Sequence, residues 1–266
     1  MSSHHPLVSI VTPSFNQASF IEETICSVLE QDYPRIEYII IDGGSNDGSV
    51  EIIQKYSGNL AWWVSEPDQG QTDAINKGFA RAQGDICAWI NSDDIYLPGA
   101  VSEAVAYLQT HPQAGMVYGD ANFVDEKGRA LGRFPARQTD YRKLLGGSVH
   151  IPQQASFFRG ELWRRVGPLD PSLYFAMDYD LWVRLAKIAP LEYYPRTWAN
   201  FRLHGSGKSV VNDSRCYPEM LRVAAREGQG WFSWLRLRYF VRSVGYAWLP
   251  MGLRRRLRGM FNLLFL

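Results

Sequence analysis

Short apolar runs alternate with amphipathic segments through the N-terminal half, and this alternation limits the fold more than any other feature. The runs at 7–12, 36–41, 60–64, 86–90 and 116–118 have the length and composition of buried strands. Residues 20–30, 50–56, 71–83 and 100–110, which lie between them, have helical spacing. The pattern predicts an α/β fold with a mostly parallel central sheet and flanking helices, whose ligands bind beyond the carboxyl ends of the strands.

Polar clusters follow the first four predicted strands directly. They are Pro13 to Asn16, Asp42 to Asp47, Glu66 to Asp73 and Asn91 to Asp94. Because the carboxyl ends of parallel strands lie at one edge of a sheet, we expect these clusters to meet there.

The fourth cluster contains two adjacent carboxylates, Asp93 and Asp94, at the end of a buried strand. Such a pair repels itself unless a cation or hydrogen-bond donors compensate the charge. Mg²⁺ and Mn²⁺ take carboxylate oxygens and often share them with a substrate phosphate. Taken alone the pair would be a turn or a helix cap, whereas the convergence of four clusters favours a cation site.

The glycine-rich turn after Asp42 has neither the spacing of a dinucleotide site nor the Lys of a phosphate-binding loop. Asp42 has two interpretations: it accepts hydrogen bonds from a nucleobase or ribose, or it closes the turn together with Ser45. In the amphipathic helix that follows, Asp73 lies at the start, near the convergent edge, while Lys77 and Arg81 indicate a solvated face.

The C-terminal half is predicted to contain a hairpin (121–124 and 130–134), strands at 155–158, 191–194 and 198–203, and a helix at 179–189. Helical spacing places Asp178 inward, as a structural cap or a shielded general base. It places Asp180 outward, in an exposed ion pair with Arg184 and Lys187. His204 begins a glycine loop with Lys208, so it is either structural or part of a phosphate-closing loop.

Composition excludes several classes of protein. A net charge of +1 over 266 residues gives no argument for nucleic acid binding. The three cysteines are far apart, so we expect no disulfide or zinc framework and a reducing, cytoplasmic location. The N-terminus leaves no room for a signal peptide, and no apolar segment reaches the length of a membrane span.

The tail, residues 231–266, contains seven arginines and no acidic residue, interleaved with Trp, Tyr and Phe. Gly245, Pro250 and Gly252 divide it into two predicted helices. This composition is typical of an interfacial helix on an anionic membrane, which would make the protein peripheral on the cytoplasmic membrane face. A helical appendage that packs on the catalytic domain or on a second subunit is the alternative.

Taken together, these residues resemble the family 2 glycosyltransferases, which have the GT-A fold. The matching motifs are Val8-Ser-Ile-Val-Thr-Pro-Ser-Phe-Asn16, Ile41-Asp-Gly-Gly-Ser-Asn-Asp-Gly-Ser49, Ser65-Glu-Pro-Asp-Gln-Gly70, Asp73-Ala-Ile-Asn-Lys-Gly78, Asn91-Ser-Asp-Asp94, Ala176-Met-Asp-Tyr-Asp-Leu-Trp182 and the His204 loop. The resemblance runs from about Leu7 to Ser209. It implies a GT-A domain over 1–209, with a donor half (about 7–119) and an acceptor half (about 120–209), and a C-terminal helical region over 210–266.

The resemblance also implies roles for individual residues. Pro13, Ser14, Asn16 and Asp42 would surround the nucleotide of a sugar donor, and Asp73 and Asp93 would add further donor contacts. Asp94 would be the principal ligand of Mg²⁺ or Mn²⁺, with His204 as an auxiliary metal or diphosphate contact. Asp178 would deprotonate the acceptor hydroxyl. The family often has Glu-Asp at this last position, and the present chain has Met177 before Asp178.

The expected activity is therefore an inverting, metal-dependent transfer of a hexosyl or N-acetylhexosaminyl group. The donor would be a nucleotide sugar, with UDP favoured, and the acceptor a glycan or a lipid-linked saccharide of cell-surface polysaccharide biosynthesis. Sugar-nucleotide pyrophosphorylases share this logic, but their basic glycine-rich N-terminal loop is absent. A non-catalytic nucleotide-sugar or glycan-binding protein of the same fold is the remaining alternative, and Met177 is the feature that favours it.

Overall fold

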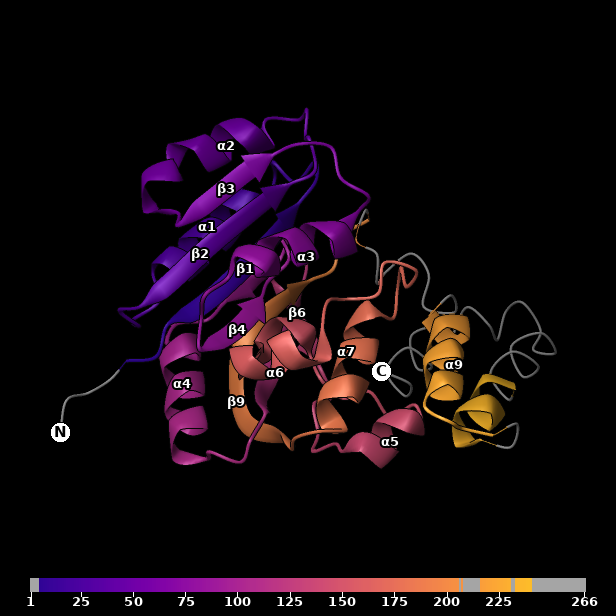
Figure 1. Ribbon diagram of the computed structural model, residues 1–266. Helices are drawn as coiled ribbons and strands as arrows, with labels where there is room; N and C mark the ends of the chain where they lie inside the picture. The colour runs from indigo at the N-terminus through magenta and orange to yellow at the C-terminus, as the bar shows by residue number, and fades with distance from the viewer. Residues whose placement is uncertain (1–4, 206, 208–215, 231–232, 241–266) are drawn as a thin grey trace.

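One sheet joins both halves of the chain in the computed structural model, which describes residues 5–205, 207, 216–230 and 233–240. The strand order is β3-β2-β1-β4-β8-β6-β9-β5, and β7 pairs with β6 (Figure 1). The N-terminal elements are β1 (Val8–Ser14), α1 (Ile21–Leu29), β2 (Ile36–Asp42), α2 (Ser49–Lys55), η1 (Ser57–Asn59), β3 (Trp62–Ser65), α3 (Gln71–Arg81), β4 (Ile86–Trp89), β5 (Ile95–Tyr96) and α4 (Ala100–Thr110). The predicted alternation of strands and helices is confirmed.

The strands β3, β2, β1 and β4 are parallel neighbours, and helices cover both faces of this part of the sheet. Ile10 and Ile40 point to the face packed by α1 and α4, whereas Val11, Ile41 and Trp89 point to the face packed by α3 and α7. Every residue of β1 is buried, as expected of a parallel strand covered on both faces.

The C-terminal half extends the same sheet with both parallel and antiparallel pairs. Its elements are β6 (Met116–Val124), β7 (Ala130–Arg133), α5 (Tyr141–Leu145), η2 (Gln153–Ala155), β8 (Ser156–Arg159), α6 (Gly160–Val166), α7 (Met177–Ala186), β9 (Leu191–Arg202) and α9 (Cys216–Arg226). The predicted hairpin is confirmed, because β6 and β7 pair antiparallel.

Two predicted strand breaks are wrong. Residues 116–124 form one strand rather than two, and β9 is continuous over 191–202. The polar and proline residues that indicated the breaks lie at a shift in the register of β6 and β9, and both strands continue past it. Tyr118 pairs with Tyr193 before the shift, and Asp120 pairs with Thr197 after it. Gly119 lies at this shift because a Cβ there would come within 2.5 Å of the Arg196 carbonyl oxygen.

The predicted C-terminal region is described only in part. Its helix α9 packs against α7, and residues 234–240 form a further helical turn (Figure 1). The rest of the two predicted tail helices lies outside the described residues. Within the described part of the chain, no helix combines the length and the apolar content needed to span a bilayer.

Candidate active site

The loops after β1 and β2 are hydrogen-bonded to each other at the carboxyl edge of the sheet. Gly43 N donates to the Ser14 carbonyl oxygen (2.8 Å), and Asn16 N donates to Ser45 Oγ (2.8 Å). Asn46 N donates back to Asn16 Oδ1 (3.0 Å), and Asn16 has a left-handed backbone with φ of 52°. The expected meeting of the polar clusters is thus observed for β1 and β2.

A chain of amide side chains joins α3, β4 and the acceptor half at the same edge. Gln71 Nε2 donates to Asn91 Oδ1 (2.7 Å), and Asn91 Nδ2 lies 3.4 Å from Gln153 Oε1. Gln153 Nε2 donates to the Trp89 carbonyl oxygen (2.7 Å). The third and fourth polar clusters therefore also converge, and Gln153 brings η2 to the end of β4.

The carboxylate of Asp42 organises the glycine-rich turn. It is fully buried and accepts hydrogen bonds from Gly44 N (3.1 Å), Ser45 N (2.9 Å), Ser45 Oγ (2.6 Å) and Ser65 Oγ (2.7 Å). A carboxylate has about four acceptor positions, so these bonds occupy its capacity. In this conformation Asp42 closes the turn. Gly44 and Ser45, which donate hydrogen bonds to it, lie nearer the surface than Asp42 itself.

The other expected donor residues lie at the same edge. Pro13 is buried within β1, and the Ser14 hydroxyl is buried with no hydrogen-bond partner among the described residues. Asp73 lies in the first turn of α3, where it accepts from Gln69 N (3.1 Å) and pairs with Lys77 (3.3 Å). In the present structure Asp73 orders the entry into α3.

Asp93 and His204 bring the segment after β4 into contact with the segment after β9. Asp93 Oδ2 lies 2.8 Å from His204 Nε2, and the two side chains are 18% and 2% exposed respectively. The pair joins residues 111 positions apart, so it forms only when the sheet is complete. A carboxylate oxygen and an imidazole nitrogen on adjacent segments are suitable ligands for Mn²⁺ and related cations.

Asp94 is fully buried behind this pair, and its Oδ1 accepts a hydrogen bond from Arg202 N (3.0 Å). Burial first, and the negative charge of Asp93 second, raise the pKa of Asp94 well above its usual range. The structure therefore gives Asp93, not Asp94, the more exposed carboxylate. The assignment of the metal to Asp94 stays a prediction, and in this structure Asp93 is the carboxylate of the pair that a ligand reaches first.

Arg202 is a residue of this site that sequence reasoning missed. Its guanidinium donates to the carbonyl oxygens of Asp93 (3.0 Å) and Glu126 (2.9 Å) and pairs with Glu23. The Arg202 side chain is 2% exposed, and its hydrogen bonds hold the Asp93–Asp94 turn in place from within the protein. The available signal was a charged residue near the end of a predicted strand, two positions before His204.

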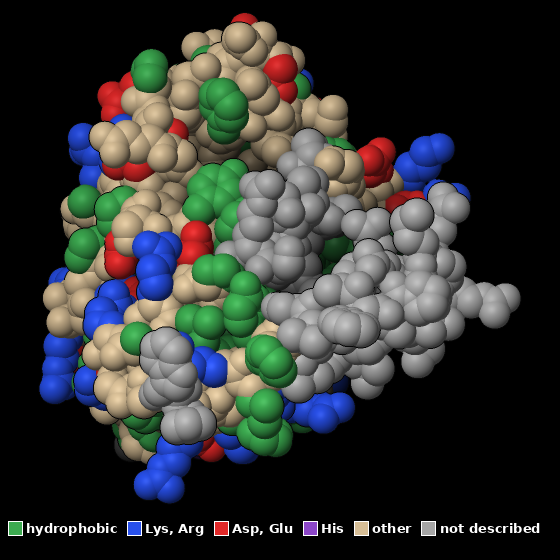
Figure 2. All heavy atoms as spheres, turned by 90° about the vertical axis from the view of Figure 1, so that its right-hand side faces the viewer, with side chains coloured by type: hydrophobic (Ala, Val, Ile, Leu, Met, Phe, Trp, Pro, Cys, Tyr) green, Lys and Arg blue, Asp and Glu red, His purple; other side chains and the backbone are tan. Residues whose placement is uncertain are grey.

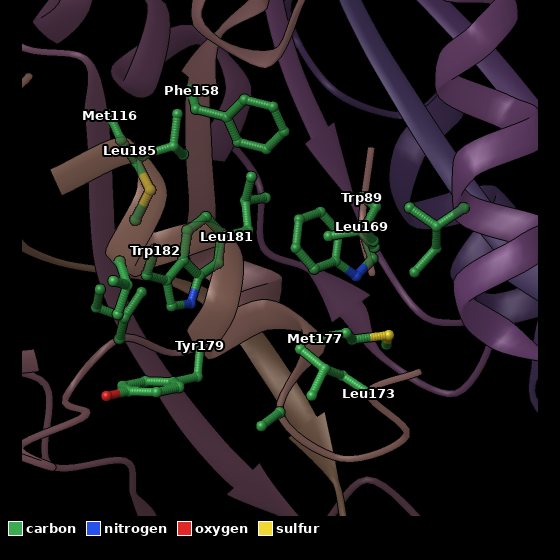
Figure 3. Close-up of a cluster of buried hydrophobic side chains, with 14 of the residues drawn as sticks. Trp89, Met116, Phe158, Leu169, Leu173, Met177, Tyr179, Leu181, Trp182 and Leu185 are labelled. Atoms are coloured by element: carbon green, nitrogen blue, oxygen red, sulfur yellow. The ribbon is translucent and has the colours of Figure 1, made fainter. Parts of the chain in front are cut away.

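Asp178 lies in the first turn of α7, half-buried rather than fully inward. The preceding residue, Met177, accepts a hydrogen bond at its sulfur from Thr72 Oγ1 (2.9 Å), so the start of α7 lies against the start of α3. Farther along α7, Trp182 stacks on Trp89 at the end of β4, with ring centroids 5.5 Å apart (Figure 3). Apolar packing thus fixes α7 relative to the strand that precedes Asp93 and Asp94.

The expectation for Asp180 is wrong. Its side chain is 1% exposed and pairs with Arg184 (2.8 Å) and with Arg226 of α9, whereas Lys187 pairs with Glu227 (2.7 Å). The helical spacing was correct, but it could not show that α9 covers this face of α7. The ion pair expected at the surface is consequently a buried network.

The residues present fit a divalent cation shared with a diphosphate. The described residues contain no group of three or more His, Cys, Asp or Glu side chains arranged as a metal site. Mg²⁺ and Mn²⁺ in nucleotide sites usually need only one or two protein ligands, because phosphate and water oxygens complete the coordination. The Asp93–His204 pair brings together two side chains of a kind that could serve as such ligands.

The curled α/β sheet, the ordered turn after β2 and the acidic pair after β4 define the GT-A class of glycosyltransferases. The chain belongs to glycosyl transferase family 2, whose family model matches residues 9–165. An uncharacterized glycosyltransferase of Mycobacterium tuberculosis is 36% identical over 186 residues, which cover 69% of this chain and 70% of that protein.

Two solved structures share the fold. The Staphylococcus aureus TarS 1–349 complex with UDP-GlcNAc superposes with a TM-score of 0.71 at 16% identity, over 92% of this chain and 77% of that one. The mannosyltransferase PcManGT of Pyrobaculum calidifontis, in complex with GDP-Man and Mn²⁺, gives a TM-score of 0.66 at 18% identity, over 98% and 81% of the two chains.

Proposed function

We propose that this glycosyltransferase is metal-dependent and transfers a sugar from a nucleoside diphosphate donor to a hydroxyl group with inversion. The observation that carries the proposal is the Asp93 Oδ2–His204 Nε2 contact of 2.8 Å at the convergent sheet edge. We assign the cation contact to Asp93 and His204, and we assign Asp94 a supporting role because it is fully buried. Pro13, Ser14, Asn16, Asp42 and Asp73 form or order the nucleotide side of the site.

The chain's own residues account for the other requirements of the reaction. Asp178 takes the proton of the acceptor hydroxyl as the acceptor oxygen bonds to the anomeric carbon and the bond to the diphosphate breaks. Attack from the face opposite the leaving diphosphate inverts the anomeric configuration, by the geometric logic of inverting glycosidases. A divalent cation, when bound, would neutralise the charge that develops on the departing diphosphate.

Donor binding tests the cation assignment. The similar proteins were solved with UDP-GlcNAc and with GDP-Man, so both are suitable probes. We expect one of them to raise the melting temperature only with Mn²⁺ or Mg²⁺ present, and Asp93→Ala or His204→Ala to remove the effect. Stabilisation that survives EDTA and both substitutions would contradict the cation site.

Product analysis separates catalysis from binding. An enzyme consumes the donor and gives an inverted anomer, and Asp178→Asn lowers turnover by about 10²-fold or more because proton transfer typically contributes that much. A non-catalytic binding protein of the same fold, the alternative that Met177 suggested, would be stabilised by the donor without consuming it. Wild-type turnover by Asp178→Asn would exclude Asp178 as the base.

We propose that the acceptor is lipid-linked and that residues 234–240 contact an anionic membrane. Leu235 of this turn is buried against Gly147, whereas Trp234, Leu237 and Phe240 are 62%, 47% and 62% exposed. Figure 2 shows the side of the molecule that carries this region, where hydrophobic side chains gather near Lys and Arg side chains. Exposed aromatic residues with basic neighbours favour the interface of an anionic bilayer.

The surroundings of His150 support a basic surface beside this turn. Burial, and then the positive charges of Arg137, Arg238 and Lys143, lower the pKa of His150. Arg238 also donates to Ser148 Oγ (3.1 Å), which ties the turn to the segment before η2.

Flotation with phosphatidylserine-containing vesicles tests the membrane contact. We expect the full chain to float, and both the Trp234→Ser/Phe240→Ser variant and a chain ending at Gly230 to lose flotation. Leu131→Ser is the matched control, because Leu131 is a 58% exposed apolar residue of β7 and is not part of residues 231–266. Equal flotation of the full and shortened chains would remove this role.

A further inference from the structure

Helix α7, which carries the proposed base, begins without a cap of its own. The N-cap residue Ala176 has no side-chain acceptor, and its backbone (φ −105°, ψ 25°) is not the extended conformation of an ordinary N-cap. The leading N–H groups of a helix need acceptors from outside the helix. In this chain a distant residue supplies acceptors for the segment that enters the helix.

Glu219 of α9 is that residue. Its Oε1 accepts from Tyr174 N (3.1 Å), and its Oε2 accepts from Phe175 N (2.8 Å) and Ala176 N (2.9 Å). The side chain is only 12% exposed, which strengthens these charge-assisted bonds. A negative charge at this end of α7 also complements the helix dipole.

Two arginines on the same face of α9 also bind the segment before and at the start of α7. Arg222 Nη2 donates to the Ser172 carbonyl oxygen (3.1 Å), and Arg226 pairs with Asp170 (3.4 Å) and with buried Asp180. Glu219, Arg222 and Arg226 are spaced three and four residues apart, so they lie on one face of the helix. This face holds residues 170–180, the segment that leads into and begins α7.

We propose that Glu219 is a positioning residue that fixes the orientation of Asp178, an inference that rests on the proposed role of Asp178 as the base. The three N–H groups that Glu219 binds immediately precede Met177 and Asp178 along the chain. Met177 has a thioether side chain and contributes no carboxylate; its sulfur accepts from Thr72 Oγ1. A base must lie within hydrogen-bond distance of the proton it removes, and small misplacements are costly. Helix α9, beyond the stretch that the family model matches, is therefore part of the catalytic apparatus.

Hydrogen–deuterium exchange tests the positioning directly. Glu219→Gln keeps the size of the side chain but loses one acceptor and the charge. We expect faster exchange in peptides covering 170–180 for this variant. Glu227→Gln is the matched control, because Glu227 lies directly after the last residue of α9 and binds Tyr141 (2.9 Å) and Lys187 (2.7 Å) instead. Wild-type exchange in Glu219→Gln, or equally fast exchange in Glu227→Gln, would overturn the inference.

A double-mutant cycle on turnover of UDP-GlcNAc or GDP-mannose with Mn²⁺ separates positioning from general stability. We expect Glu219→Gln to lower kcat about tenfold or more with little change in donor Kd, because a displaced base slows only the chemical step. In the Asp178→Asn background the same change should have no further effect. An equal loss in both backgrounds would show that Glu219 does not act through Asp178. Wild-type turnover by Asp178→Asn would overturn the base assignment and with it the catalytic role of Glu219, whereas the exchange result would still measure how Glu219 orders residues 170–180.

Discussion

Asp93 and Asp94 are neighbours in sequence with opposite environments. Asp93 contacts His204 near the surface, whereas Asp94 is fully buried against the backbone of Arg202. Burial raises the pKa of Asp94, so the folded state holds the proton of this carboxyl more tightly than the unfolded state does. The stability that this proton contributes is fully present below the unfolded value near 3.8 and is lost as pH rises through the folded pKa.

The first prediction concerns this residue. Asp94→Asn removes the buried charge, so without divalent cations it should raise the free energy of unfolding at pH 8 and flatten its decline with pH. Each unit by which the folded pKa is raised corresponds to about 1.4 kcal/mol. Denaturant unfolding at pH 5 and pH 8 measures the effect. Asp93→Asn, which removes the neighbouring charge but leaves the buried Asp94 carboxyl in place, is the comparison and should keep a decline of stability with pH, because burial is the larger cause of the raised pKa. An unchanged slope in Asp94→Asn would contradict the prediction.

At the scale of elements, the close approach of α3 to β1 fixes the start of α3 at the site. Gly78 makes this approach possible, because a Cβ there would lie 2.4 Å from Val11 Cγ1. Ala is normally better than Gly inside a helix by about 1 kcal/mol, yet overpacking typically costs about 1–3 kcal/mol. At Gly78 we therefore expect the cost of the clash with Val11 to exceed the gain in helix propensity.

Gly78→Ala is accordingly expected to destabilise the protein by up to about 2 kcal/mol, net of the helix-propensity gain of about 1 kcal/mol. Adding Val11→Ala removes the methyl groups that clash, so the cost of the Gly78 substitution should fall towards zero in that background. Thermal or urea unfolding of the four variants of this cycle provides the measurement. Additive costs would show that the Cβ is accommodated in another way.

At the scale of the whole molecule, the site exists only when distant segments meet, so ligand binding should stabilise the entire fold. A free donor concentration of about 100 times its Kd raises the free energy of unfolding by about 2.7 kcal/mol. For a chain of this size that corresponds to a rise in Tm of about 5–10 °C. We expect the donor that binds to produce this shift with Mn²⁺ and to lose it with EDTA, measured by scanning fluorimetry. A shift in Asp93→Ala equal to that of the wild type would contradict it.

The sequence alone determined the order of elements and the location of the site, because both depend on local patterns. Apolar runs and helical spacing predicted nearly every element of the donor half within a few residues. The rule that parallel strands end at one edge then brought Asn16, Asp42, Asp73 and Asp93 together without any coordinates. The roles of individual residues came from the resemblance to the family.

Only the tertiary structure decided which side chains are buried and which segments cover them. Asp180 was expected at the surface and is buried, because α9 returns from beyond β9 and places Arg226 on it. Arg202 and Glu219 were not singled out, because their partners lie 109 and 43 to 45 residues away. Helical spacing gives the face of a helix, but the long-range packing of the chain determines what that face meets. The difference in burial between Asp93 and Asp94 is therefore a property of the fold.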